Sequence, residues 1–237
     1  RDATYKDAFT DKWSLDFTDL FLVGGQFDRV VEKYQLTPFI QQEDFAELIK
    51  RMLSIRQGNS IVPFDRVSAD GLLQYVRQLG TDLVGCELGV CWGYTLRYFL
   101  DKSTEIKKVY AVDAWQPYQD WWGPVTQELV DVWRAHAFAL LKPYQSQVEI
   151  LEMDSTEAAA RVPDESVDFI FIEGDQWYDA VCRELRCYWP EMKLGGIFAG
   201  HDWNLPEVNR AVNDFRKELD ITTEIQHTSK NVWFWYR

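Results

Sequence analysis

Apolar runs rich in β-branched and aromatic residues alternate with amphipathic stretches from residue 82 onward. This alternation is typical of a parallel β-sheet that is covered by helices on both faces. It predicts strands over 82–88, 108–113, 148–153, 167–173 and 195–200. It predicts helices over 94–102, 125–141, 155–161, 176–192 and 205–219.

Two further strands are predicted near the end of the sequence, over 222–227 and 231–237. Only Thr228, Ser229 and Lys230 separate them, whereas a parallel crossover needs about a dozen residues. The two strands must therefore form an antiparallel hairpin. The predicted fold is a doubly wound, Rossmann-like α/β domain with a seven-stranded, mainly parallel sheet that ends in this hairpin.

The first 80 residues lack this alternation and show helical patterns near 43–55 and 67–79 instead. We predict an N-terminal helical extension over 1–80, as a lid or a pocket wall, followed by one domain over 81–237. A chain of 237 residues suits this arrangement better than two separate enzyme domains.

The charge balance narrows the range of partners. The sequence has 25 Lys and Arg residues against 38 Asp and Glu residues, a net charge of −13. Without a basic face, a nucleic-acid backbone would be repelled. No stretch approaches the ~20 apolar residues of a membrane helix, and no signal-peptide pattern is present. We expect a cytoplasmic protein that acts on a small molecule, binds neither nucleic acid nor membrane, and could form a homo-oligomer.

A glycine-containing turn follows the first predicted strand, in the sequence Glu87-Leu88-Gly89-Val90-Cys91-Trp92-Gly93. Glycines allow a tight strand-to-helix turn and let backbone N–H groups approach a ligand closely. The turn alone is a weak signal, because both glycines could serve only the local geometry.

The next two strand ends carry groups that suit a nucleoside. Asp113, followed by Ala114, ends the second strand, where a carboxylate could accept hydrogen bonds from both ribose hydroxyls. The third strand ends in Met153, Asp154 and Ser155, where a polar group could bind the adenine amino group and Met153 could pack on the ring. Ligands of such sheets lie beyond the carboxyl ends of the strands, so the three ends predict one site.

With these motifs, the chain resembles the class I S-adenosylmethionine (AdoMet)-dependent methyltransferases, and within them the branch of small-molecule and sugar O-methyltransferases. The likeness covers about residues 61–237 and is strongest over 169–175 (FIFIEGD) and 194–202 (LGGIFAGHD). It implies methyl transfer from AdoMet to a hydroxyl of a sugar, phenolic or natural-product acceptor. The cofactor-binding residues that it implies are Glu87, Gly89, Val90, Gly93, Asp113, Ala114, Met153, Asp154, Ser155 and Glu173.

The ends of the fourth and fifth strands are candidates for the reaction site. In several relatives, acids at these positions bind a divalent cation, so the resemblance makes Glu173 and Asp202 candidate Mg²⁺ ligands, with Asp175 in reserve. We predict that His201 is the general base, because a neutral imidazole accepts a hydroxyl proton near neutral pH. Alternatively, His201 donates to a carbonyl and Asp202 caps a helix that begins near Leu205.

Family members commonly have Asp where Glu173 stands and a His-Ser pair where Gln176-Trp177 stands, so the substrate side of the site is expected to differ. Tryptophans are expected to line the acceptor pocket, and the segment 115–124 could close over it as a lid. Alternatively, that segment packs against the N-terminal helices. The predicted pocket residues are Trp115, Trp121, Trp122, Trp177 and Trp203.

Two other functions remain open. A nicotinamide-dependent dehydrogenase would use the same ribose carboxylate, but it expects G-x-G-x-x-G where this chain has Glu87-x-Gly89-x-x-x-Gly93. A C-terminal hairpin is also unusual in that class. A non-catalytic AdoMet-binding domain would be expected to lack the acid and the histidine at the fourth and fifth strand ends.

Overall fold

The computed structural model describes residues 69–120, 123–228 and 231–237. The chain divides into two compact units, Arg1–Arg66 with Trp115–His136, and Val67–Ala114 with Ala137–Arg237. The main sheet belongs to the second unit. The predicted helix over 43–55, and most of the predicted extension over 1–80, lie outside the described residues.

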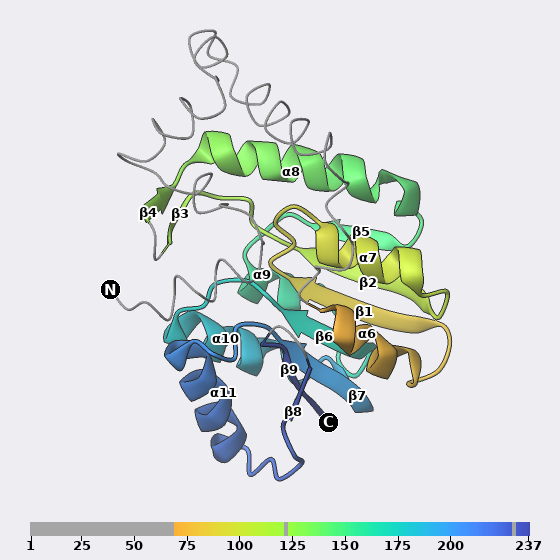
Figure 1. Ribbon diagram of the computed structural model, residues 1–237, viewed down its shortest axis with the longest axis vertical. Helices are drawn as coiled ribbons and strands as arrows, with labels where there is room; N and C mark the ends of the chain where they lie inside the picture. The colour runs from red at the N-terminus through yellow and green to blue at the C-terminus, as the bar shows by residue number, and fades with distance from the viewer. Residues whose placement is uncertain (1–68, 121–122, 229–230) are drawn as a thin grey trace, which may run out of the picture. The chain divides into compact units, whose positions relative to one another are not determined.

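The main sheet has seven strands in the order β5-β2-β1-β6-β7-β9-β8 (Figure 1). The first five run parallel, and β9 runs antiparallel to both β7 and β8. The strands are β1 (Leu83–Leu88), β2 (Ile106–Val112), β5 (Val148–Leu151), β6 (Val167–Ile172), β7 (Met192–Gly200), β8 (Gln226–His227) and β9 (Trp233–Tyr236).

Helices cover both faces of this sheet. Phe99 and Phe169 bring α7 against one face, with ring centroids 5.8 Å apart. Trp189, directly after α10, packs on Phe198, with ring centroids 5.6 Å apart. Phe169 pairs with Ile197, the neighbour of Phe198, so the two contacts lie on opposite faces. The helices are α6 (Asp70–Arg77), α7 (Tyr94–Lys102), α8 (Gln127–Leu141), α9 (Ser155–Ala159), α10 (Tyr178–Tyr188) and α11 (Pro206–Glu218), with a short 3₁₀ helix at Lys142–Tyr144.

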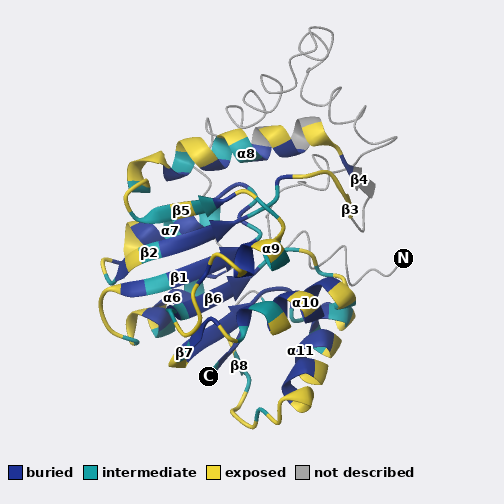
Figure 2. Ribbon diagram, turned by 180° about the vertical axis from the view of Figure 1, so that it is seen from behind, coloured by how far each residue is buried: buried dark blue, intermediate teal, exposed yellow. Residues whose placement is uncertain are grey.

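Burial explains why these segments form a sheet. Figure 2 shows the central strands almost wholly buried, whereas α10 and α11 are buried on one side and exposed on the other. Near-continuous apolar strands are expected in a parallel sheet that is covered on both faces. None of the helices in the described part of the chain is long and apolar enough to cross a membrane.

The predicted doubly wound sheet with a C-terminal hairpin is confirmed. No strand was predicted over the segment 115–124, which was expected to close over the pocket as a lid. A small antiparallel hairpin forms there from β3 (Tyr118–Asp120) and β4 (Gly123–Val125). Strands of three residues are too short to show a clear apolar alternation. The predicted strand over 222–227 is reduced to two residues in β8.

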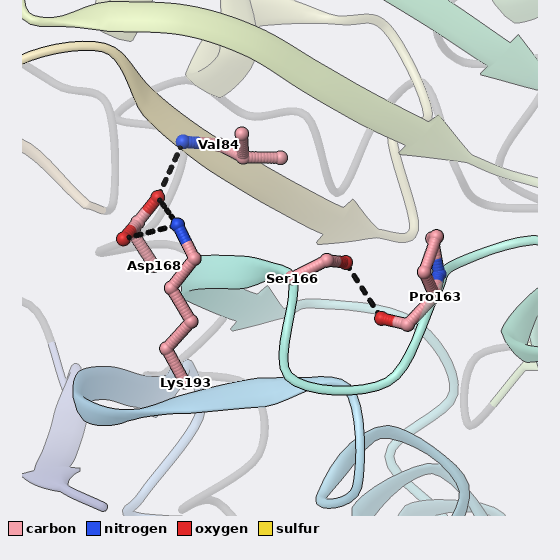
Figure 3. Close-up of polar contacts among 5 residues, drawn as sticks. All are labelled: Val84, Pro163, Ser166, Asp168 and Lys193. Carbon is pink, nitrogen blue, oxygen red and sulfur yellow. Dashed lines mark hydrogen bonds and ion pairs between the residues drawn. The ribbon is translucent and has the colours of Figure 1, made fainter.

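Asp168 ties three strands together at the amino edge of the sheet (Figure 3). Its Oδ2 accepts the backbone N–H of Val84 on β1 at 2.8 Å. Lys193 on β7 donates to both carboxylate oxygens at 2.9 and 2.8 Å. The side chain of Asp168 is 17% exposed, so water screens this network only in part.

Asp168→Ala should destabilise the fold more than Asp168→Asn. Alanine leaves the Val84 N–H without its acceptor, at a cost of about 1–3 kcal/mol, whereas asparagine keeps an acceptor oxygen and loses only the charge. Urea unfolding of both variants, with Lys193→Met as the control for the ion pair alone, measures the difference. Equal free energies of unfolding for the Ala and Asn variants would contradict this assignment.

Candidate functional site

Backbone hydrogen bonds continue one residue beyond the strands at the carboxyl edge of the sheet. The residue after each strand donates its N–H to the last carbonyl of the neighbouring strand, at 2.8 to 3.2 Å. The four donors are Asp113, Gly89, Glu173 and His201. These four residues belong to separate motifs that were predicted to form one site. They lie in one row along the carboxyl edge of the sheet.

The turn after β1 requires its glycines. Gly89 has φ +85°, and a Cβ there would lie 2.5 Å from the carbonyl oxygen of Glu173. Gly93 has φ +81° and precedes α7, and its N–H donates to the carbonyl of Val90 at 2.7 Å. At both positions the positive φ disfavours residues with a Cβ, and at Gly89 the neighbouring backbone also leaves no room for one. Glycine tolerates both constraints. Glu87 and Val90 are buried beside this turn.

Asp113 holds the same turn from the neighbouring strand. Its Oδ2 accepts the N–H of Cys91 at 2.8 Å, and Cys91 has φ 49°. A charged acceptor for this N–H helps to stabilise the unusual backbone conformation. Sequence reasoning missed this bond, because the pairing spans 22 positions. Asp113 and the following Ala114 are half-buried.

The turn after β5 places Met153, Asp154 and Ser155 at the start of α9. Asp154 is the N-cap and accepts the N–H of Thr156 at 2.8 Å. The hydroxyl of Thr156, with the backbone N–H groups of the helix, holds the pKa of Asp154 below its usual value. An ionised cap is favourable at a helix N-terminus. Met153 and Ser155 are half-buried here.

Glu184 on α10 is a site residue that sequence reasoning missed. It is 5% exposed, it bonds the Ser155 side chain, and its Oε1 would lie 3.0 Å from a Cβ at Gly174. Burial raises its pKa from 4.5 to about 8. A signal was present in the sequence, because Glu184 follows Val181 by three positions and precedes Tyr188 by four, which puts a carboxyl on the apolar face of the helix.

His201 lies between two carboxylates at the ends of β6 and β7. Its Nδ1 is 2.8 Å from Asp202 Oδ1 and 3.7 Å from Glu173 Oε1. The three side chains are at most 10% exposed. Both carboxylates thus lie on the Nδ1 side of the imidazole. No side chain in the described part of the chain caps α11, whose N-cap is Leu205, so the predicted capping role of Asp202 is not observed.

Among the described residues, the structure gives no support for the predicted cation site. Among residues 69–237 outside the undescribed gaps, no three His, Cys, Asp or Glu side chains are grouped to hold a metal. Asp175 is exposed and accepts the N–H of Trp177 at 3.0 Å. Glu173 and Asp202 both face the His201 imidazole instead.

The predicted pocket tryptophans separate into three groups. Trp177 is 40% exposed directly before α10, and the ring of Trp203 lies beside that of His227 in a tilted arrangement, with ring centroids 4.9 Å apart. Trp115 is buried within the other compact unit, where Gln127 donates to its carbonyl at 3.1 Å. Trp121 and Trp122 lie outside the described residues. A pocket built by all five is therefore still a prediction.

The donor set at this edge fits AdoMet. No described side chain caps the N-terminus of α7, and its first turn contains no acid, which favours a carboxylate ligand there. A half-buried aspartate at the end of β2 suits ribose hydroxyls, which are donors. The half-buried thioether of Met153 next to the capped α9 suits a flat apolar base with a polar rim.

The chain is similar to a methyltransferase family in sequence and to an O-methyltransferase in fold. Residues 86–203 match the family model described as a methyltransferase domain. The structure of the O-methyltransferase NovP is similar with a TM-score of 0.51 and 21% identity, over 70% of this chain and 79% of that one. A protein from Corynebacterium glutamicum gives a TM-score of 0.49 at 13% identity, over 85% and 95% of the two chains. A comparison with curated protein sequences gives no match.

The raised pKa of Glu184 predicts that stability falls as pH increases. Folding raises this pKa from 4.5 to about 8, so the folded state binds more protons across that window. The free energy of unfolding should therefore decrease from pH 4.5 to 8, by at most about 1.4 kcal/mol per pH unit for one proton. Denaturant unfolding at pH 5, 6.5 and 8 should show a shallower slope for Glu184→Gln. Parallel curves for the two proteins would disprove the assignment.

Proposed function

The chain belongs to the class I methyltransferases, and we propose that it transfers a methyl group from AdoMet to a hydroxyl of a small molecule. The row formed by Gly89, Asp113, Glu173 and His201 along one edge carries this proposal. The row joins donor-binding groups and a histidine base in one compact unit. The C-terminal hairpin and the absence of G-x-G-x-x-G weigh against a dehydrogenase.

Different parts of the edge would hold different parts of AdoMet. The turn of Glu87, Gly89, Val90 and Gly93 and the start of α7 would take the amino acid part. Asp113 and Ala114 would take the ribose. The turn of Met153, Asp154 and Ser155, with Glu173 opposite, would take the adenine. When bound, the cofactor supplies a methyl group on a positively charged sulfur, which is a good leaving group.

His201 would remove the proton of the acceptor hydroxyl as the methyl group is transferred. Asp202 Oδ1 lies 2.8 Å from Nδ1 and Glu173 Oε1 lies 3.7 Å from it, so the two carboxylates would hold the imidazole in place. The indole of Trp233 donates to the His201 carbonyl at 2.9 Å and fixes its backbone. We assign Glu173 and Asp202 to the positioning of the His201 imidazole. Assistance by Mg²⁺ stays a prediction.

The acceptor would bind beside the exposed Trp177 and the half-buried Trp203. Flat aromatic faces suit the apolar face of a sugar or a phenolic ring. A buried base also suits an acceptor that displaces water as it binds, because a dry site strengthens the electrostatic interactions of the histidine and the carboxylates.

AdoMet should stabilise the protein against heat, and NAD should not. A ligand that binds only the folded state raises its apparent stability. Asp113→Ala should raise the Kd for AdoMet roughly 10- to 100-fold, because charge-assisted hydrogen bonds contribute about 1.5–3 kcal/mol each. Asp164→Asn is the matched control, since Asp164 is exposed before β6 at the opposite edge. Stabilisation by NAD instead of AdoMet would favour the dehydrogenase.

Replacing His201 should remove turnover but not donor binding. His201→Asn keeps an N–H donor toward Asp202 and removes the base, so methyl transfer should fall on the order of 10²-fold. Binding of S-adenosylhomocysteine, measured by calorimetry, should stay unchanged. The assay is run with and without EDTA, and loss of wild-type activity with EDTA would return Glu173 and Asp202 to the role of cation ligands. Unchanged turnover would refute the base.

A further inference from the structure

Two side chains of α10, one helical turn apart, hold Ser155 at the start of α9. The hydroxyl of Tyr188 donates to the Ser155 carbonyl at 2.8 Å. Glu184 hydrogen-bonds to the Ser155 side chain. Both helical residues are buried. Residues four apart lie on the same helix face, so α10 holds both the backbone and the side chain of the first residue of α9.

Glu184 also supports the loop after β6. A Cβ at Gly174 would lie 3.0 Å from Glu184 Oε1, and a Cβ at Gly89 would lie 2.6 Å from the Cα of Gly174. Gly174 is therefore packed between the turn after β1 on one side and the Glu184 carboxyl on the other. Through one side chain, α10 contacts both loops that flank the proposed adenine site.

The surroundings of Glu184 disfavour a negative charge. Its Oε2 is buried and has no hydrogen-bond partner among the described residues. A buried carboxylate oxygen without a donor favours the protonated acid. The ionisable groups that face Glu184 from the packed elements are Asp154 before α9, Asp175 after β6, Cys86 on β1, and Arg183, Cys187 and Tyr188 on α10.

We propose that Glu184 is a positioning residue for the donor, which in its neutral form holds Ser155 and Gly174 at the spacing that the adenosyl group needs. This proposal rests on the proposed function. An ionised Glu184 would lie close to Asp154 and Asp175, and the repulsion would push the two loops apart. Donor affinity should therefore be constant up to the pKa of about 8 and fall as pH rises above it.

The chain offers a matched control in the turn between α10 and β7. Glu191, directly before β7, is also a buried acid, 6% exposed, and burial raises its pKa to about 7. It precedes β7, at the amino edge of the sheet. Glu191→Gln therefore removes a comparable buried proton site without touching Ser155 or Gly174.

The test measures the Kd for S-adenosylhomocysteine by calorimetry between pH 6.5 and 9.5. The proteins are the full chain as wild type, Glu184→Gln, Glu184→Ala and Glu191→Gln. The amino group of the ligand ionises equally in all four experiments. The ratio of the Kd values of two proteins at one pH therefore reflects only ionisation of the protein. Circular dichroism at each pH confirms that each variant is folded.

Relative to Glu184→Gln, the wild-type Kd should rise above pH 8 by up to about tenfold per pH unit. Glu184→Ala should bind several-fold more weakly than Glu184→Gln at pH 7, and Glu191→Gln should follow the wild type throughout. A pH-independent ratio of wild type to Glu184→Gln overturns the proposal, and if Glu184→Ala does not fold, this ratio decides alone. A folded wild type that binds no ligand at pH 6.5 refutes the proposed function instead.

Discussion

The close approach of the turn after β1 to the loop after β6 is the constraint on which the candidate site depends. At Gly89, even a methyl group would lie 2.5 Å from a backbone carbonyl of the neighbouring loop. This contact is possible because the hydrogen-bond ladder continues past the strands, through the N–H groups of Asp113, Gly89, Glu173 and His201. Four loops that differ in sequence are therefore fixed to one another by main-chain bonds, and side-chain variation can alter the ligand without moving the edge.

The carboxylates at this edge contact the protein's own backbone and side chains. Asp113 accepts the N–H of Cys91, and Asp154 accepts the N–H of Thr156. Asp202 contacts the imidazole of His201, and Glu184 bonds Ser155. A net charge of −13 is compatible with a precise site, since Asp113 and Asp154 accept backbone N–H groups and burial raises the pKa of Glu184.

The sequence predicted the fold well, because apolar strands such as Phe169–Ile172 are long enough to show their periodicity. Strand ends were also predictable, since each site motif follows a strand directly. The hairpin of β3 and β4 was missed because its strands are too short. The bonds of Asp113 to Cys91 and of Glu184 to Ser155 join distant positions, and no local pattern records which elements meet. The residues that bind a ligand therefore stay predictions, although their common edge is a finding.

The last strand of the sheet supports only one part of the candidate site. This strand follows every other strand of the sheet in chain order, yet it pairs between β7 and β8. Its Trp233 anchors the carbonyl of His201. The hydrogen bonds described above for the turns after β1, β2 and β5 involve no residue of β9. The backbone of His201 is therefore anchored from the last strand of the sheet, whereas the turns that would hold the donor are anchored from within its parallel part.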